Sequence, residues 1–161
     1  KMASIDKLTD IYNRRMIDEY ISQETTKSKR HKSDFSLMIL DIDYFKETND
    51  KYGHQVGDEI LIQICNIISN NIRESDIFGR WGGEEFILLL PQTNLDNAYI
   101  VAENLRNKIE NHSFEKVGQK TISIGISQFD NIEDTKQFIK RADDAMYKAK
   151  NSGRNKVLVS E

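Results

Sequence analysis

Two adjacent glutamates, Glu84 and Glu85, follow a pair of glycines, Gly82 and Gly83, near the middle of the chain. Apolar, strand-like runs flank the glycine pair, which predicts a tight hairpin because both central residues of a type I′ turn need positive φ. Two neighbouring like charges repel each other and bring no obvious packing benefit. A polar hairpin tip would explain them on its own, whereas a second acidic cluster would favour a metal or nucleotide site.

A second acidic cluster stands earlier in the chain, where the near-continuous apolar run of residues 35–40 ends at Asp41 and Asp43. Such a run predicts a central strand that is covered on both faces. A buried strand that ends in two aspartates places carboxylates at one end of a sheet, beside whichever hairpin adjoins it. Hard oxygen ligands of this kind suit Mg²⁺, which takes one or two carboxylates and leaves positions for water and phosphate.

Length and composition indicate one globular domain with a sizeable core: the chain has 161 residues, 38% of them hydrophobic and 30% charged. No apolar run approaches the length of a membrane span and no signal peptide is visible, so we expect a cytoplasmic protein. The net charge of −3 argues against a general nucleic-acid binder but not against a nucleotide substrate. The single cysteine, Cys65, excludes an intrachain disulfide framework.

Helical and strand-like patterns alternate along the chain. Helices are expected after a cap at Asn13, over residues 44–51, 57–72, 98–109 and 138–149, with residues 25–33 and 52–55 as surface connections. Strands are expected over residues 34–43, in both arms of the hairpin, over 121–128 with one buried face, and over 157–159. Because the hairpin is antiparallel, the pattern predicts an α/β (α+β) sandwich with an antiparallel or mixed sheet of about five strands.

Three sequence blocks, in order, resemble the GGDEF-domain diguanylate cyclase family. The family signature GG(D/E)EF stands at residues 82–86, the pattern D-x-D-x-F-K-x-x-N-D at residues 41–50, and G-H-x-x-G-D at residues 53–58. The resemblance runs from residue 6 to residue 155. Several sequence blocks in the right order identify a family far more specifically than the five-residue signature alone. It implies a central, mainly antiparallel sheet flanked by helices, and a single domain over 1–161 that is the C-terminal module of a longer signalling protein.

The resemblance implies a reaction in which two GTP molecules form cyclic di-GMP and release two pyrophosphates. Each step is in-line attack of a ribose 3′-hydroxyl on an α-phosphate, which needs positioning and charge neutralisation more than covalent help. By resemblance, Mg²⁺ (or Mn²⁺) is held by the Asp41 carboxylate, the Ile42 carbonyl and the Glu84 carboxylate. Glu84 is also given the role of base in the family, but a metal-bound carboxylate has a low pKa, so we interpret it first as a ligand.

The sequence leaves two alternative roles for each of two acidic residues, Glu85 and Asp43. Glu85 either helps to organise the metal or the attacking hydroxyl, or pairs with a nearby basic group. Asp43 either joins the site or caps the short helix that begins at Tyr44, and we favour the cap because aspartate is preferred at helix starts.

The guanine contacts of the family correspond to Asn49 and Asp58. An amide and a carboxylate match the N1–H, N2–H and O6 edge of guanine, although alone both residues are typical of turns and helix starts. Relatives that make mixed guanine–adenine products typically carry serine at the position of Asp58, so aspartate favours the guanine-only product.

The triphosphate contacts of the family correspond to Lys46, next to Phe45, and to Lys150 and Arg154. Without the resemblance, Lys150 and Arg154 would simply complement the C-terminus of the last helix.

Arg73 and Asp76 form an R-x-x-D pattern with five residues between Asp76 and Gly82, the offset at which the family binds inhibitory product. Arginine suits that role because its planar fork binds phosphate bidentately and stacks on purines. The alternative is an arginine at a helix end followed by an acid at a strand start. A further arginine usually completes the site, and Arg106 is a candidate.

The resemblance also implies partners: a two-fold homodimer for catalysis, since each subunit holds one GTP, and an upstream sensor domain, with no nucleic acid and no membrane segment in this chain. Two alternatives remain. One is a non-catalytic module that binds GTP or cyclic di-GMP, and the other is a related palm-fold nucleotidyl cyclase with a different product.

Overall fold

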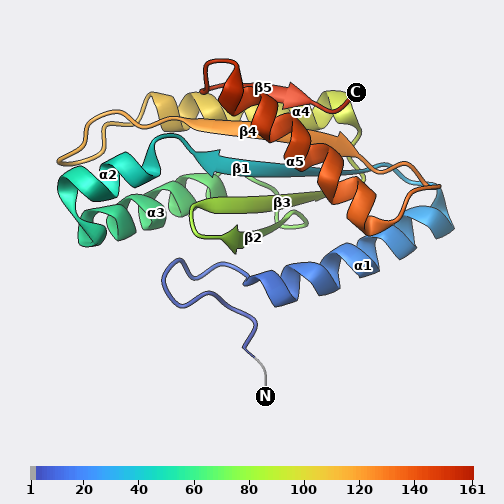
Figure 1. The fold of residues 1–161 in the computed structure, drawn as a ribbon. Helices are drawn as coiled ribbons and strands as arrows, with labels where there is room; N and C mark the ends of the chain where they lie inside the picture. The colour runs from blue at the N-terminus through green and yellow to red at the C-terminus, as the bar shows by residue number, and fades with distance from the viewer. Residues whose placement is uncertain (1–2) are drawn as a thin grey trace.

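The structure is a computed structural model that describes residues 3–161, in which a single five-stranded sheet is flanked by helices (Figure 1). The elements in chain order are α1 (Arg14–His31), β1 (Phe35–Ile42), α2 (Phe45–Tyr52), α3 (His54–Ser69), β2 (Ile77–Gly82), β3 (Glu85–Pro91), α4 (Leu95–Glu110), β4 (Ile122–Gln128), α5 (Thr135–Asn151) and β5 (Val157–Val159). Within the described residues, no helix combines the length and the apolar character that crossing a membrane requires.

The sheet has the strand order β2-β3-β1-β4-β5, with β1 at its centre. Strand β1 runs antiparallel to both β3 and β4, and β2 runs antiparallel to β3, whereas β5 is parallel to β4. The expected mainly antiparallel sheet is therefore confirmed.

Two layers of helices cover the sheet, with α1 and α5 on one face and α3 and α4 on the other (Figure 1). Side chains of β1 alternate between the two cores: Leu37 and Ile39 pack toward α1 and α5, while Met38 and Leu40 pack toward α3 and α4. All eight residues of β1 are buried, which explains its near-continuous apolar sequence.

Strand β4 differs from its predicted one-sided burial, because all of its residues except the last are buried. Its small side chains, Ser123, Gly125 and Ser127, leave room for α5 to lie directly on the strand. A Cβ atom added to Gly125 would stand only 2.2 Å from the backbone oxygen of Ala142 and 2.2 Å from the backbone nitrogen of Met146. The serines and glycine that looked like a solvent face therefore form a close helix–strand contact.

Two helix boundaries also differ from the prediction. Helix α1 begins after the expected Asn13 cap but continues through residues 25–31, so its basic residues occupy the last turn, where cations complement the helix dipole. Helix α3 begins at His54, directly after Gly53, whose φ of 91° allows the sharp change of direction from α2. Residues 52–55 are thus a helix–helix junction in which Gly53 alone separates the two helices, and not the expected loop.

Replacing Gly125 by alanine is expected to destabilise the protein by about 3 kcal/mol, because the added methyl group meets the rigid backbone of α5 and not a movable side chain. Urea denaturation followed by circular dichroism measures the change. Gly82→Ala is the matched control, since an added Cβ there meets nothing within 4 Å and should change the unfolding free energy by less than about 0.5 kcal/mol. Equal effects of the two substitutions would contradict this account of the α5–β4 contact.

Candidate active site

The hairpin between β2 and β3 turns one residue later than the sequence suggested. Gly82 pairs with Glu85, so Gly83 and Glu84 are the two turn residues, and the prediction of a turn centred on Gly82 and Gly83 was wrong. The register shifts between Arg80 and Gly82, and this irregularity takes up the displaced residue. Glu84 therefore lies in the turn itself, while Glu85 is the first residue of β3.

Arg80 holds this turn in place. Its Nε and Nη2 atoms donate to the carbonyl oxygen of Gly83 at 3.0 and 2.8 Å, and its Nη1 atom lies 3.2 Å from Asp6 Oδ2. Asp6 in turn accepts hydrogen bonds from the backbone and the hydroxyl of Thr9. The sequence analysis missed Arg80, although an arginine two residues before a glycine turn is a signal for a side chain that closes the turn.

The acids of the two predicted clusters meet at one end of the sheet. Asp41 stands opposite Glu85 in the pairing of β1 with β3, and the backbone N–H of Ile42 donates to the carbonyl oxygen of Glu84 at 3.3 Å. Asp41, Glu84 and Glu85 line one open hollow of about 500 Å³. The strand-end acid and the hairpin acids are therefore neighbours.

The lining of this hollow also includes residues to which the sequence analysis gave no role. Asp143 and Tyr147 reach it from α5, and the guanidinium of Arg14 stacks on the Trp81 ring, 3.8 Å from the ring centroid. Helix α5 was recognised from its apolar positions alone, and periodicity cannot show what the other side of a helix faces.

Burial and mutual repulsion disfavour the charged forms of two of these acids. Burial raises the pKa of Asp41 to about 6, with further contributions from Glu84 and Asp43, although the ammonium of Lys150 opposes the change. Burial likewise raises the pKa of Glu85 to about 7, helped by the charges of Asp41 and Asp143. A divalent cation in the hollow would reverse this, because it favours the ionised form of every acid around it.

The donor set fits an open magnesium site and not a closed one. Two carboxylates, Asp41 and Glu84, flank the Ile42 peptide, and Mg²⁺ typically uses one or two carboxylates and keeps its other positions for water and phosphate. Among residues 3–161, no three His, Cys, Asp or Glu side chains converge to enclose a metal by themselves.

Asp43 does not cap α2, so that prediction was wrong. The N-cap residue is Tyr44, in a left-handed conformation, and no side chain caps the helix. The fully buried carboxylate of Asp43 instead accepts hydrogen bonds from Thr121 Oγ1 and Ser123 Oγ, both at 2.7 Å, and from the Asn155 N–H at 2.9 Å. Asp43 therefore ties the end of β1 to β4 and to the segment before β5.

Lys150 and Arg154 converge on the two aspartates at the end of β1. Lys150 Nζ lies 2.8 Å from Asp41 Oδ1 and 3.7 Å from Asp43 Oδ1. Arg154 Nη1 lies 4.0 Å from Asp43 Oδ1, and its guanidinium lies over the Tyr44 ring, 4.6 Å from the centroid. Both cations thus stand beside the acids and do more than complement a helix end.

The predicted guanine contacts lie where α2 packs against α3. Asn49 Oδ1 is buried and has no hydrogen-bond partner among the described residues. The Asn49 side chain lies directly against Gly57, where an added Cβ would stand 1.8 Å from that oxygen, so a larger residue there would displace the Asn49 amide. Asp58 follows Gly57 and is exposed.

The predicted triphosphate contacts on α2 lie at the start of that helix. Phe45 is buried in the core, whereas the Lys46 side chain is 83% exposed and pairs with Asp50 at 2.9 Å. An exposed pair of this kind is weak, so Lys46 is free to exchange Asp50 for another anion.

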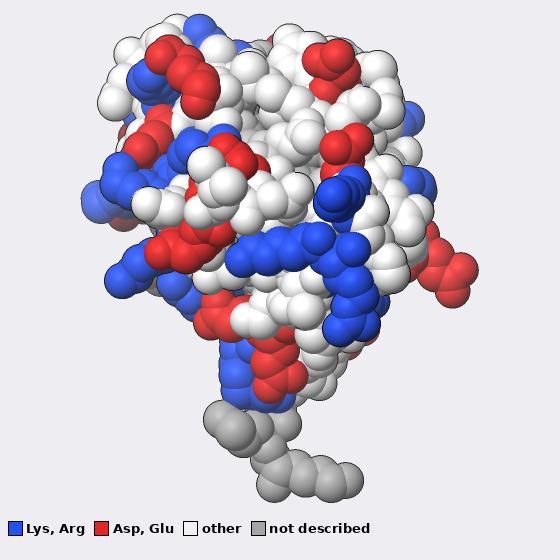
Figure 2. Space-filling model, turned by 90° about the vertical axis from the view of Figure 1, so that its right-hand side faces the viewer, with Lys and Arg blue, Asp and Glu red and all other residues white. Residues whose placement is uncertain are grey.

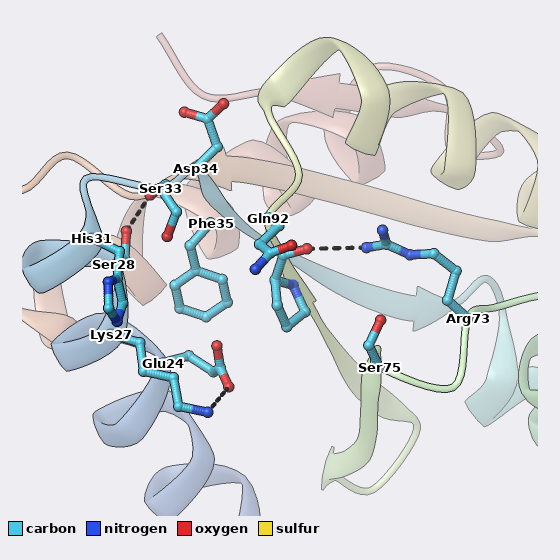
Figure 3. Close-up of a pocket in the computed structure, with 11 residues that line it drawn as sticks. Glu24, Lys27, Ser28, His31, Ser33, Asp34, Phe35, Arg73, Ser75 and Gln92 are labelled. Atoms are coloured by element: carbon cyan, nitrogen blue, oxygen red, sulfur yellow. Dashed lines mark hydrogen bonds and ion pairs between the residues drawn. The ribbon is translucent and has the colours of Figure 1, made fainter.

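Arg73 and Asp76 lie at the far end of β3, about 20 Å along the strand from Glu85. The Arg73 guanidinium binds the buried Asp76 carboxylate at 2.9 Å and donates to the Pro91 carbonyl and to Thr93 Oγ1, yet its side chain stays 53% exposed. Figure 3 shows Arg73 at the edge of a hollow of about 410 Å³ whose opposite side is formed by α1.

Acidic and basic side chains share this end of the molecule. Figure 2 views the end where α1 finishes and β1 begins, and it shows Lys and Arg interspersed with Asp and Glu over the visible face. Arg106 does not line the hollow beside Arg73, because it is held on α4 by Glu103, Glu110 and Asn155. The structure therefore gives no support to Arg106 as the residue that completes the R-x-x-D site.

The sheet topology and the acid-bearing hairpin at its end define a domain of the nucleotidyl cyclase type, and comparison with known proteins specifies the family. The family model described as "Diguanylate cyclase, GGDEF domain" matches residues 3–156. This chain belongs to the GGDEF-domain family.

Curated relatives and solved structures agree with the family assignment. The chain is 39% identical over 158 residues to diguanylate cyclase DgcM of Escherichia coli K12, and 35% identical over 164 residues to the response regulator PleD of Caulobacter vibrioides, covering 98% of this chain in each case. It spans only 38% and 36% of those two proteins.

Among solved structures, the GGDEF domain of DgcB from Caulobacter crescentus, in complex with c-di-GMP, superposes with a TM-score of 0.94 at 28% identity, covering 99% of this chain and 96% of that one. Diguanylate cyclase SiaD from Pseudomonas aeruginosa, in complex with its activator SiaC, gives a TM-score of 0.94 at 39% identity, covering 98% of this chain and 62% of that one.

Replacing Glu85 by glutamine is expected to raise the melting temperature of the metal-free protein above pH 7 by a few degrees. The folded pKa of about 7 exceeds the ordinary value of 4.5, so the folded state binds more protons than the unfolded state between these values. Glu85 therefore makes stability fall as pH rises through this window, and Asp41 acts in the same direction.

Thermal melts in EDTA across this pH range measure the effect, with Glu85→Gln flattening the dependence and exposed Glu115→Gln leaving it unchanged. Identical dependence of the melting temperature on pH for wild type and Glu85→Gln would contradict the raised pKa assigned to the Glu85 carboxyl.

Proposed function

We propose that this chain is a diguanylate cyclase that joins two GTP molecules into cyclic di-GMP and releases two pyrophosphates. The observation that carries the proposal is the meeting of Asp41 and Glu84 in one open hollow at the end of the sheet. Relatives that are named diguanylate cyclases support it, although this chain spans less than two fifths of the longer relatives cited above.

Asp41, the carbonyl of Ile42 and Glu84 are proposed to hold Mg²⁺ or Mn²⁺. When bound, the ion would neutralise charge on phosphate oxygens and lower the pKa of the attacking hydroxyl. The raised pKa of Asp41 supports this, since a buried carboxylate beside other acids gains most from a cation.

Asn49 and Asp58 are proposed to recognise guanine. The buried Asn49 Oδ1 is an acceptor without a partner, so a guanine N–H that reaches it would satisfy an atom that otherwise stays unpaired. Asp58 follows the glycine against which Asn49 rests and is exposed, and we propose that it accepts from the same edge of the base. Adenine lacks the adjacent N1–H and N2–H donors of guanine, which is why we favour the guanine-only product.

Four groups of the chain are proposed to bind the triphosphate. Lys46 offers a charged side chain. The N–H groups in the first turn of α2, which begins at Phe45, offer the N-terminus of a helix. Lys150 and Arg154 approach from the other side and already neutralise Asp41 and Asp43. A phosphate group would share these cations with the aspartates.

Bond formation then needs a proton acceptor. The 3′-oxygen of one GTP attacks the α-phosphorus of the other, the bond to pyrophosphate breaks, and the hydroxyl proton passes to a base. Glu85 is proposed as that base because it lines the same hollow as Asp41 and Glu84, and the ionised form that a bound cation would favour can accept the proton. Glu84 remains a ligand first in this proposal.

The product contains two guanylates, and we propose that each hollow takes one GTP, so that catalysis requires a homodimer in which two hollows face each other. Cyclic di-GMP is proposed to inhibit by binding at Arg73 and Asp76, where the half-exposed guanidinium borders the hollow between Arg73 and α1 (Figure 3). A cytoplasmic location and an attached sensor domain complete the proposal, and the greater length of the curated relatives supports the latter.

Glu84→Gln is expected to lower cyclic di-GMP synthesis from GTP by roughly 100-fold, because it keeps the shape of the side chain and removes a carboxylate charge. Chromatography of the products formed from GTP, or from ATP, with Mg²⁺ at high protein concentration measures the rate. Glu84→Asp keeps the carboxylate and should retain most of the activity. Wild-type protein that binds GTP without turnover would instead identify a non-catalytic binding module, and turnover of ATP would identify a cyclase with another product.

Arg73→Ala is expected to raise the cyclic di-GMP concentration needed for half-inhibition by at least about tenfold, since it removes the guanidinium that would bind phosphate. The initial rate before product accumulates should stay within about twofold, because Arg73 lies some 20 Å from the acids. Lys108→Ala, an exposed cation on α4, is the control for loss of surface charge. Unchanged inhibition in Arg73→Ala would place the inhibitory site elsewhere.

A further inference from the structure

Lys120 is a buried cation that none of the proposed roles uses. It precedes β4, is only 8% exposed, and its ammonium donates to the carbonyl oxygen of Asp43 and to Thr48 Oγ1, both at 2.8 Å, with the Tyr44 carbonyl oxygen at 3.4 Å. Two of the acceptors belong to the turn from β1 into α2, and the third, Thr48, lies in α2 itself. A single lysine that is distant in sequence therefore holds this turn, which we call the β1–α2 corner (Asp43 and Tyr44).

Stability alone is a poor explanation for this lysine. Burial lowers the pKa of Lys120, and the nearby negative charge of Asp43 only opposes that change. The ammonium also stands at the N-terminal end of α2, where the helix dipole disfavours a cation. An apolar side chain of similar volume often replaces a buried charge without loss of stability.

The β1–α2 corner carries much of the proposed phosphate site. Asp43 directly follows Ile42, and its carboxylate lies beside Lys150 and Arg154. Tyr44 adopts a left-handed backbone, with φ 56° and ψ 35°, and its ring lies beneath the Arg154 guanidinium. The orientation of the Asp43 and Tyr44 peptide groups consequently fixes the carbonyl of Ile42. It also fixes the Asp43 and Tyr44 side chains, which Lys150 and Arg154 contact.

Thr48 completes the contact between Lys120 and the β1–α2 corner. Its hydroxyl accepts from Lys120 and donates to the Tyr44 carbonyl oxygen at 3.1 Å. The same carbonyl also accepts from the Thr48 backbone N–H at 3.0 Å and from Lys120 at 3.4 Å. Without the ammonium, the Asp43 carbonyl would lose its hydrogen bond from Lys120, and Tyr44 would be less constrained in a conformation that is unfavourable for a residue with a Cβ.

We propose that Lys120 is a positioning residue for the triphosphate: it holds the peptide carbonyls of Asp43 and Tyr44, so that Ile42, Lys150 and Arg154 keep the arrangement that binds phosphate. The inference rests on the proposed function, because it assigns Lys120 to the same site.

Lys120→Met tests this, with Lys116→Met as the control because Lys116 is an exposed lysine of the same connection between α4 and β4. Calorimetry with a non-hydrolysable GTP analogue and Mg²⁺ should show about tenfold weaker binding for Lys120→Met, whereas affinity for guanosine, which has no phosphate, stays within about twofold. The melting temperature should not fall by more than about 2 °C. Equal losses for both ligands together with a lower melting temperature would reduce Lys120 to a structural residue, and unchanged affinity for both would also overturn the proposal.

Thr48→Val provides a second variant. Because Thr48 and Lys120 share a hydrogen bond, the double variant should lose less analogue affinity than the product of the two single losses. Independent, multiplicative losses would show that the two residues do not act through one contact.

Amide NMR signals of residues 44–46 in the ligand-free protein separate this inference from the proposed catalysis. They should shift in Lys120→Met and not in Lys116→Met, whether or not the wild type makes cyclic di-GMP. If the wild type binds the analogue but does not turn over GTP, the proposed cyclase activity is refuted. The role of Lys120 is then decided by the ratio of analogue affinities between the wild type and Lys120→Met. Unmoved signals, or a wild type that does not bind the analogue, would overturn the assignment of Lys120.

Discussion

The antiparallel pairing of β1 with β3 is the constraint on which the candidate site depends. This pairing joins two strands buried on both faces and places Asp41 opposite Glu85 at the end of the sheet. A slip of one residue would turn every side chain of a strand toward the other core, so the register is strongly fixed by the packing on both sides. The acids are therefore brought together by the hydrophobic core, and burial first, with their mutual repulsion added to it, raises the pKa values of Asp41 and Glu85.

A second set of contacts surrounds the carboxylate of Asp43 and compensates for its burial. Its partners come from β4, from the end of α5 and from the segment before β5, all far from it in sequence. Lysines and an arginine gather around the two aspartates, so the end of the sheet combines acids that suit a cation with cations that suit a phosphate. Such a mixed arrangement matches a metal–nucleotide complex better than either component alone.

The sequence predicted the order of the elements, the central strand and the neighbouring acid clusters, because each has a local signature in periodicity or in turn residues. It failed where a residue's role depends on a distant partner. Asp43 looks like a helix cap until Thr121 and Ser123 are seen beside it, and the small residues of β4 look solvent-facing until α5 is placed on them. Lys120 escaped for the same reason, since its local context does not show that it holds the carbonyl of Asp43, 77 residues away.

The one-residue displacement of the hairpin gives the two adjacent glutamates different mechanical freedom. Glu85 is locked in a paired strand, so its carboxyl can move only by rotating its own side-chain bonds. Glu84 sits on a two-residue loop whose other member, Gly83, has no Cβ and tolerates many backbone angles. Arg80 and the Ile42 N–H still hold the two carbonyl groups of this loop. The added freedom of Glu84 is therefore only that of an unpaired turn residue, whereas Glu85 is fixed by its strand, even though the two side chains are chemically identical.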